Sequence, residues 1–214
     1  FNQAIKAKPY LAEPYYYRAI AKYYLDDTQG AEEDCTLALE RNPFMTRVYQ
    51  LRADARQALE NYDGALADYN IVLAAYPNDK FSLINTGIVN IQKKDYENAE
   101  IILDKLIKTY PTYTQGYLTR GALYQEKGDT IKAFDNYNEA IKTDKYMPQA
   151  YSLRGLLYYT TSDYDKSLAD FNEAIRLDPL QTGNYINRGL VKYSKNDLRG
   201  AMADYDKVID LEPN

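Results

Sequence analysis

The amino-acid sequence predicts an all-α protein built from stacked helical hairpins. Two segments nearly repeat each other 34 residues apart: SLADFNEAIRLDP begins at Ser167 and AMADYDKVIDLEP begins at Ala201. Proline recurs at the same interval, with Lys145 in the one slot that lacks it; these prolines are Pro9, Pro43, Pro77, Pro111, Pro179 and Pro213. A fixed period of about 20 to 50 residues indicates an array of one supersecondary unit, each copy packed on the next.

Placing this proline at position 32 of a repeat divides the chain without a change of phase. The sequence predicts a single array over residues 1–214, in which residues 1–11 end a preceding repeat. The six full repeats are expected at residues 12–45, 46–79, 80–113, 114–147, 148–181 and 182–214. Because both ends of the chain interrupt the array, we expect it to be a fragment of a longer chain.

Each repeat has the residue spacing of two amphipathic helices. Position 4 is Tyr or Leu, position 8 is Ala or Gly, position 20 is Ala or Ser, and position 28 is Leu or Ile. The spacing of positions 4, 8 and 11, and then of 20, 24, 27 and 28, follows the i, i+3, i+4 rhythm of helices. Small residues at positions 8 and 20 allow the two backbones to approach closely.

The ends of the second helix are also marked in the sequence. Position 16 is Asp or Asn in every repeat: Asp27, Asn61, Asp95, Asp129, Asp163 and Asp197. These side chains accept a hydrogen bond from the free amides at a helix start, which stabilises the helix by about 1 kcal/mol. Proline at position 32 ends the helix because it disfavours the helical conformation in the residue before it.

Arginine at position 7 and an acid or amide at position 23 occur together. The five pairs are Arg18 with Asp34, Arg52 with Asp68, Arg120 with Asn136, Arg154 with Asp170, and Arg188 with Asp204. The repeat at 80–113 lacks both partners, since it has Thr86 and Ile102. We therefore predict that the two side chains touch across the hairpin as an internal pair, in preference to a ladder of charges for ligand binding.

The chain resembles the tetratricopeptide repeat (TPR) family over essentially its whole length. The family pattern is an aromatic at positions 4 and 24, Gly or Ala at 8, Ala at 20 and 27, and Pro at 32, and most columns match it. Departures are Tyr for the usual Trp at position 4, Arg for an aliphatic residue at position 7, and Leu83 and Leu103 in place of aromatics. The resemblance implies a right-handed superhelical α-solenoid of antiparallel hairpins. Arg at position 7, with an Asp at 23 and an aromatic at 24, resembles bacterial arrays, and the abundance of Tyr, Asn, Lys and Ile fits an AT-rich bacterial genome.

In this family, positions 2, 5, 9 and 12 of the first helix usually face a concave groove. The large apolar and Tyr residues there are the candidate contacts: Tyr16, Ile20, Tyr23, Ile84, Ile88, Ile91, Leu156, Tyr159, Ile186, Leu190 and Tyr193. The alternative is that some of them pack neighbouring first helices together. The Lys and Asn set with which some TPR domains bind an acidic chaperone tail is absent, so we do not expect that ligand.

Composition excludes several classes of function. The chain has no His and a single cysteine, Cys35, so zinc, haem and iron–sulfur ligand sets are not expected; Cys35 is predicted to be a buried apolar residue. The net charge of -5 is opposite to the basic surface that nucleic acids require. No apolar run reaches the roughly 20 residues of a membrane-spanning helix, so direct membrane insertion is not expected.

The sequence therefore predicts a noncatalytic scaffold, without cofactor or metal, that binds a peptide or protein segment in its groove. One alternative is self-association into a homo-oligomer, or docking within a larger protein. A more remote alternative is a helical carbohydrate-active enzyme, but the groove acids Glu13, Asp54 and Glu126 lie in different repeats, whereas glycosidase carboxylates lie within about 10 Å of each other. The sequence does not distinguish a cytoplasmic from a periplasmic location.

Overall fold

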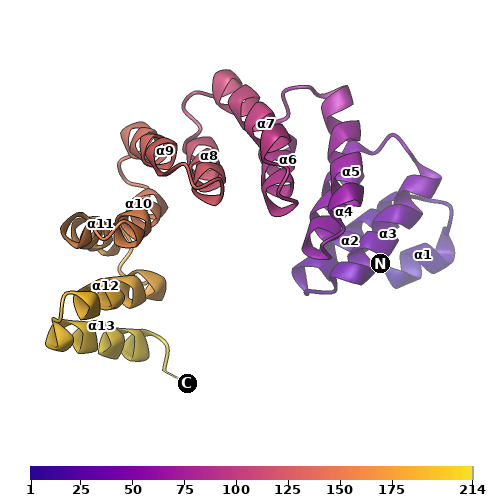
Figure 1. The fold of residues 1–214 in the computed structure, drawn as a ribbon. Helices are drawn as coiled ribbons and strands as arrows, with labels where there is room; N and C mark the ends of the chain where they lie inside the picture. The colour runs from indigo at the N-terminus through magenta and orange to yellow at the C-terminus, as the bar shows by residue number, and fades with distance from the viewer. Residues whose placement is uncertain (214) are drawn as a thin grey trace. The chain divides into compact units, whose positions relative to one another are not determined.

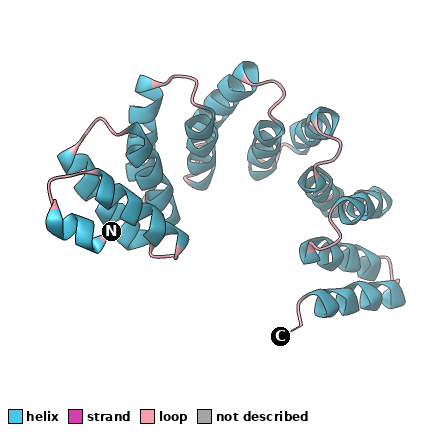
Figure 2. Ribbon diagram, turned by 180° about the vertical axis from the view of Figure 1, so that it is seen from behind, coloured by secondary structure: helices cyan, strands magenta, loops and turns pink. Residues whose placement is uncertain are grey.

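The computed structural model describes residues 1–213, and their regular structure is entirely helical (Figure 1; Figure 2). These residues form thirteen helices and no strand, which confirms the all-α prediction. The helices are α1 (Asn2–Ala7), α2 (Glu13–Tyr24), α3 (Thr28–Arg41), α4 (Thr46–Ala58), α5 (Tyr62–Ala75), α6 (Lys80–Gln92), α7 (Tyr96–Thr109), α8 (Thr114–Glu126), α9 (Thr130–Thr143), α10 (Pro148–Thr160), α11 (Tyr164–Leu177), α12 (Thr182–Ser194) and α13 (Leu198–Leu211).

The helices pack in consecutive pairs within two compact units, Phe1–Tyr110 and Pro111–Asn214. In the first unit, α2 packs on α3, α4 on α5 and α6 on α7; in the second, the pairs are α8 with α9, α10 with α11, and α12 with α13. Inside each unit, the second helix of one hairpin also packs on the first helix of the next. This is the stacked-hairpin arrangement that the 34-residue period predicts.

Close approach of the paired helices depends on the small residue at position 8. A Cβ atom added to Gly121 would lie 2.4 Å from the ring of Tyr137, and one added to Gly189 would lie 2.7 Å from the ring of Tyr205. Such distances are well inside normal van der Waals contact. The pairing of a small residue on the first helix with a large one on the second therefore fixes how the hairpin closes.

The predicted internal pairs are confirmed, and they also connect neighbouring repeats. Arg154 donates from Nε and Nη2 to the two carboxylate oxygens of Asp170, at 2.8 and 2.7 Å. Its third nitrogen, Nη1, donates to Asn138 of the preceding repeat at 2.7 Å. The other pairs are Arg18 with Asp34, Arg52 with Asp68, Arg188 with Asp204, and, to an amide, Arg120 with Asn136. One guanidinium thus joins three helices.

The repeat without this arginine has an open space instead. Thr86 stands at position 7, and its buried Oγ1 has no hydrogen-bond partner within residues 1–213. A pocket of about 310 Å³ lies beside it, between α5, α6 and α7. Its lining residues are Leu66, Asn70, Thr86, Asn90, Asn98, Ile101 and Ile102.

Tyrosine at position 4 makes a second connection between neighbouring repeats. The hydroxyl of Tyr185 donates to the carbonyl oxygen of Pro179, at 3.1 Å. Tyr15, Tyr117 and Tyr151 make the same bond to the residue at position 32 of the preceding repeat, at 3.1 to 3.2 Å. Tyr therefore reaches a backbone acceptor at a site where the family usually has Trp.

The turn between the two helices uses a left-handed residue followed by the predicted cap. Position 15 has positive φ in all six repeats, between 59° and 76°, and only Gly128 is a glycine; the others are Asp26, Glu60, Lys94, Ser162 and Asn196. The side chain of the next residue, Asp or Asn, accepts a hydrogen bond from the amide three residues further on, as Asp197 does from Gly200 at 2.9 Å. The N-cap prediction is therefore confirmed at position 16.

Replacing Lys94 by glycine is expected to raise the free energy of unfolding by about 0.5 to 1 kcal/mol, because glycine adopts positive φ without steric cost. Urea denaturation measures the change. Asn196→Gly is the matched control, and it should gain less because Asn tolerates the left-handed region better than Lys does. A loss of stability in the Lys94 variant would contradict this explanation of the turn.

Candidate functional site

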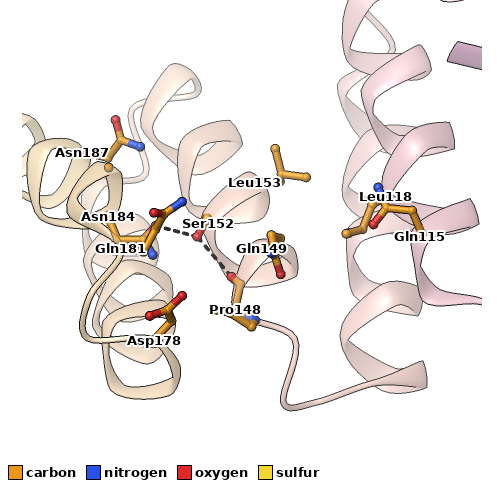
Figure 3. A pocket seen from close by; sticks show the side chains of 11 residues that line it. Gln115, Leu118, Pro148, Gln149, Ser152, Leu153, Asp178, Gln181, Asn184 and Asn187 are labelled. Carbon is orange, nitrogen blue, oxygen red and sulfur yellow. Dashed lines mark hydrogen bonds between the residues drawn. The ribbon is translucent and has the colours of Figure 1, made fainter. Parts of the chain in front are cut away.

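A pocket of about 300 Å³ lies on the first helices of the second unit (Figure 3). It is formed by the N-terminal halves of α8, α10 and α12 and by the turn before α12. Most of its polar groups are neutral amides. The lining residues are Gln115, Leu118, Pro148, Gln149, Ser152, Leu153, Asp178, Gln181, Gly183, Asn184 and Asn187. We call this site the second-unit pocket.

Part of the polar lining of the second-unit pocket is held in place. The hydroxyl of Ser152 lies 2.6 Å from Oδ1 of the buried Asn184, which connects α10 to α12 (Figure 3). The side chains of Gln115, Gln149 and Asn187, in contrast, make no hydrogen bond to any residue in 1–213. Each amide has both donor and acceptor capacity to offer to a ligand.

One residue in the wall of the second-unit pocket, Gly183, has no side chain. Gly183 lies at the start of α12, and a Cβ atom added there would have no neighbouring atom within 4 Å. A side chain added at this position therefore starts from open space at the pocket wall. Gly183 is therefore a position at which bulk can be added to the pocket wall with no clash at the Cβ atom.

A second site lies between α2 and α4 in the first unit, and we call it the first-unit pocket. It measures about 320 Å³ and combines tyrosine, aliphatic and charged side chains. The lining residues are Tyr16, Ile20, Tyr23, Tyr24, Arg47, Gln50, Leu51 and Asp54. Gln50 and Asp54 also line a smaller space of about 200 Å³ toward α6, together with Tyr69, Phe81, Ser82 and Asn85.

Asp54 is the acid of the first-unit pocket, and neutral donors hold it. The hydroxyl of Tyr69 and the amide of Asn85, at 3.2 Å, both donate to its Oδ1. Burial raises the pKa of Asp54, although these hydrogen bonds oppose the shift. Burial, followed by the charge of Asp54, also raises the pKa of Tyr23.

Comparison with known proteins identifies the family. Models described as tetratricopeptide repeat match residues 51–114, 148–179 and 183–214, which together make up more than half of the chain. The chain belongs to the tetratricopeptide repeat family. A search of curated protein sequences found no match.

Solved TPR structures share the fold. Yeast Tom70 is 19% identical and superposes with a TM-score of 0.78, over 100% of this chain and 45% of its own. A tetratricopeptide repeat protein from Parabacteroides merdae ATCC 43184 is 19% identical, with a TM-score of 0.74 over 95% of this chain and 80% of its own. MamA from Desulfovibrio magneticus RS-1 is 22% identical, with a TM-score of 0.64 over 78% and 94%. At these identities the likeness concerns the fold alone.

The TPR array brings only some of the predicted contact residues together. Tyr16, Ile20 and Tyr23 line one pocket. Ile84 is 5% exposed, so its side chain packs against neighbouring helices. For this residue the alternative interpretation, helix packing in place of groove contact, applies. The remaining candidates lie outside the two pockets: Ile88, Ile91, Leu156 and Tyr159 are partly buried, whereas Ile186, Leu190 and Tyr193 are exposed.

Sequence reasoning missed the amide-rich lining of the second-unit pocket. It selected large apolar and Tyr residues, whereas Gln149, Asn184 and Asn187 are polar and stand at positions 2, 3 and 6 of their repeats. The available signal was Gln at position 2 of two successive repeats, Gln115 and Gln149, followed by Asn184 and Asn187 in the next repeat. Within residues 1–213, no three His, Cys, Asp or Glu side chains are grouped so that they could hold a metal ion. None of the helices in these residues is long and apolar enough to cross a membrane.

Proposed function

We propose that this TPR protein is a noncatalytic scaffold that binds a peptide or protein segment on the first helices of its repeats. TPR repeats generally mediate interactions between proteins. The observation that carries the proposal here is the second-unit pocket, which is open, spans three consecutive first helices, and keeps the side-chain amides of Gln115, Gln149 and Asn187 without partners within residues 1–213.

A polypeptide segment suits this lining for chemical reasons. An extended peptide has backbone N–H and C=O groups that need hydrogen-bond partners, and side-chain amides supply both kinds. Leu118 and Leu153 add apolar surface beside the amides. In the first unit, Tyr16, Ile20 and Tyr23 offer larger apolar contacts, and Tyr is favoured at interfaces because it adds area with little loss of entropy.

The lining of the two pockets favours binding over catalysis. Each pocket contains a single acid, Asp178 in the second unit and Asp54 in the first, so neither holds a carboxylate pair for acid–base chemistry. Cys35, the one cysteine, is buried, and burial raises its pKa to about 12, which keeps the thiol protonated and unreactive. These features support a scaffold whose ligand is bound and released unchanged.

Peptide selection from a random displayed library tests the proposal. Peptides selected on the wild-type chain should bind the Gly183→Leu variant at least about tenfold more weakly, because the new side chain fills the second-unit pocket. The matched control is Ile131→Asn on α9, which alters an exposed apolar side chain outside the pocket and should leave affinity unchanged. Equal affinity for wild type and Gly183→Leu, or failure to select any peptide, would contradict the proposal.

Light scattering at two protein concentrations separates this proposal from self-association. A receptor for a separate segment should keep the mass of one chain at both concentrations. A mass that rises with concentration, and falls back when Ile186, Leu190 and Tyr193 are replaced by serine, would instead support association through the exposed apolar residues of α12.

A further inference from the structure

Asp54 differs from the other acids at the hairpin interfaces because no cation neutralises it. Asp34, Asp68, Asp170 and Asp204 each form a salt bridge with an arginine, at 2.5 to 2.8 Å. Asp54 forms no salt bridge within residues 1–213, and its hydrogen-bond donors, Tyr69 and Asn85, are neutral. A partly buried carboxylate without a counter-charge lowers the stability of the fold.

One oxygen of Asp54 remains available to a ligand. Both neutral donors bind Oδ1, and no residue in 1–213 donates to Oδ2. The residue is part of the wall of both adjoining pockets in the first unit. An ionised carboxylate accepts hydrogen bonds on both oxygens, so Oδ2 has unused capacity at the pocket surface.

The rest of the first-unit pocket suits a positive group next to Asp54. Tyr23 contributes an aromatic ring, whose π face attracts cations. The positive charge in the lining, Arg47, precedes Asp54 by seven residues on α4, which separates their backbones by about 10 Å along the helix. The two charges therefore favour a cationic group at the Asp54 end of the pocket and disfavour it at the Arg47 end.

We propose that Asp54 binds the guanidinium or ammonium group of an Arg or Lys side chain in the bound segment, with Tyr23 beside its methylene stem. This inference rests on the proposed function, because it specifies the chemistry of one contact in the segment. The net charge of -5 favours the approach of a basic segment. The cation supplies the counter-charge that the folded chain does not.

If the charge of Asp54 served the fold, removing it would lower the Tm. A charge that serves a ligand predicts the opposite. Asparagine at this position keeps an oxygen that accepts from Tyr69 and Asn85 but carries no charge. Asp54→Asn should therefore raise Tm by about 2 °C or more at neutral pH, because it removes an uncompensated carboxylate. The same variant should lose affinity for a cationic segment. Greater stability combined with weaker binding is the signature of a charge kept for a ligand.

NMR titration of the ¹⁵N-labelled full chain provides the test. The probe is acetyl-Ala-Ala-Arg-Ala-Ala-amide, and the matched control replaces Arg by citrulline, which has nearly the same shape and no charge. We expect saturating shifts at the amides of Tyr23, Asp54 and Asn85 with a Kd in the mM range, as suits a single ionic contact. The citrulline peptide, and the Asp54→Asn variant with the Arg peptide, should each bind at least about tenfold more weakly.

Three results would overturn the inference: equal affinity for the Arg and citrulline peptides, unchanged affinity in Asp54→Asn, or no saturable shift near Asp54 with either peptide. A lower Tm for Asp54→Asn would assign the carboxylate to the fold and would overturn it as well. These outcomes are distinct from failure of the proposed function. Peptides selected on the wild-type chain and weakened by Gly183→Leu would still support segment binding, without a cationic contact at Asp54.

Discussion

Replacing Arg154 by alanine is expected to lower the free energy of unfolding by about 3 to 5 kcal/mol, because it leaves a buried carboxylate without a counter-charge. Asp170 is 5% exposed, and within residues 1–213 Arg154 is the one cation that binds it. The substitution also removes the bond to Asn138 in the preceding repeat. Urea denaturation followed by circular dichroism measures the loss.

Two variants control for the loss of side-chain contacts. In Arg52→Ala, Asp68 keeps a second partner, since Arg56 Nη1 lies 2.8 Å from its Oδ2, so we expect a smaller loss of about 1 to 3 kcal/mol. Thr86→Ala removes a hydroxyl that has no partner within residues 1–213 and should change stability by less than about 1 kcal/mol. Similar losses for Arg154→Ala and Thr86→Ala would show that the ion pair does not hold the repeats together.

Replacing Gly121 by alanine should lower the free energy of unfolding by about 1 to 3 kcal/mol, because the added methyl group overlaps a fixed ring. The Cβ atom would lie 2.4 Å from Cε1 of Tyr137, which is fully buried. The ring cannot move aside easily, since its hydroxyl donates to Gln125 at 3.0 Å. The steric cost outweighs the gain of about 1 kcal/mol that alanine brings to a helix interior.

Gly183→Ala is the matched control, since it makes the same substitution in a helix of the same unit. Its Cβ atom would meet no other atom within 4 Å, so only the helix propensity changes, and stability should rise by about 0.5 to 1 kcal/mol. Thermal denaturation of both variants gives the comparison. Changes of the same sign in the two proteins would contradict close packing at position 8 as the cause.

The features predicted correctly from the sequence are those that repeat with the 34-residue period. Asp163 at position 16 predicts a helix start because the capping interaction is local, and the side chain does accept from the Lys166 amide. The joint replacement of Arg and Asp by Thr86 and Ile102 predicts a contact across the hairpin, and the remaining repeats contain it. Because equivalent positions recur in six repeats, two residues that change together in one repeat can be recognised as a pair from a single sequence.

Features that depend on side-chain direction or backbone conformation were not predictable in this way. Lys94 and Ser162 adopt positive φ although their residue type gives no indication of it, because the geometry of the turn imposes the conformation. Ile84 is buried although it stands at a position that usually faces the groove. The reach of Arg154 Nη1 to Asn138 depends on how one hairpin packs on another, which no single repeat encodes.

Hydrogen exchange measured with and without a selected peptide tests the central claim most directly, because it locates the bound segment on the repeats. We expect slower exchange at residues of the first helices that line the two pockets, such as Tyr23 in α2 and Ser152 in α10. Changes confined to the exposed faces of the second helices, for example around Ile131 in α9 and Met202 in α13, would contradict it.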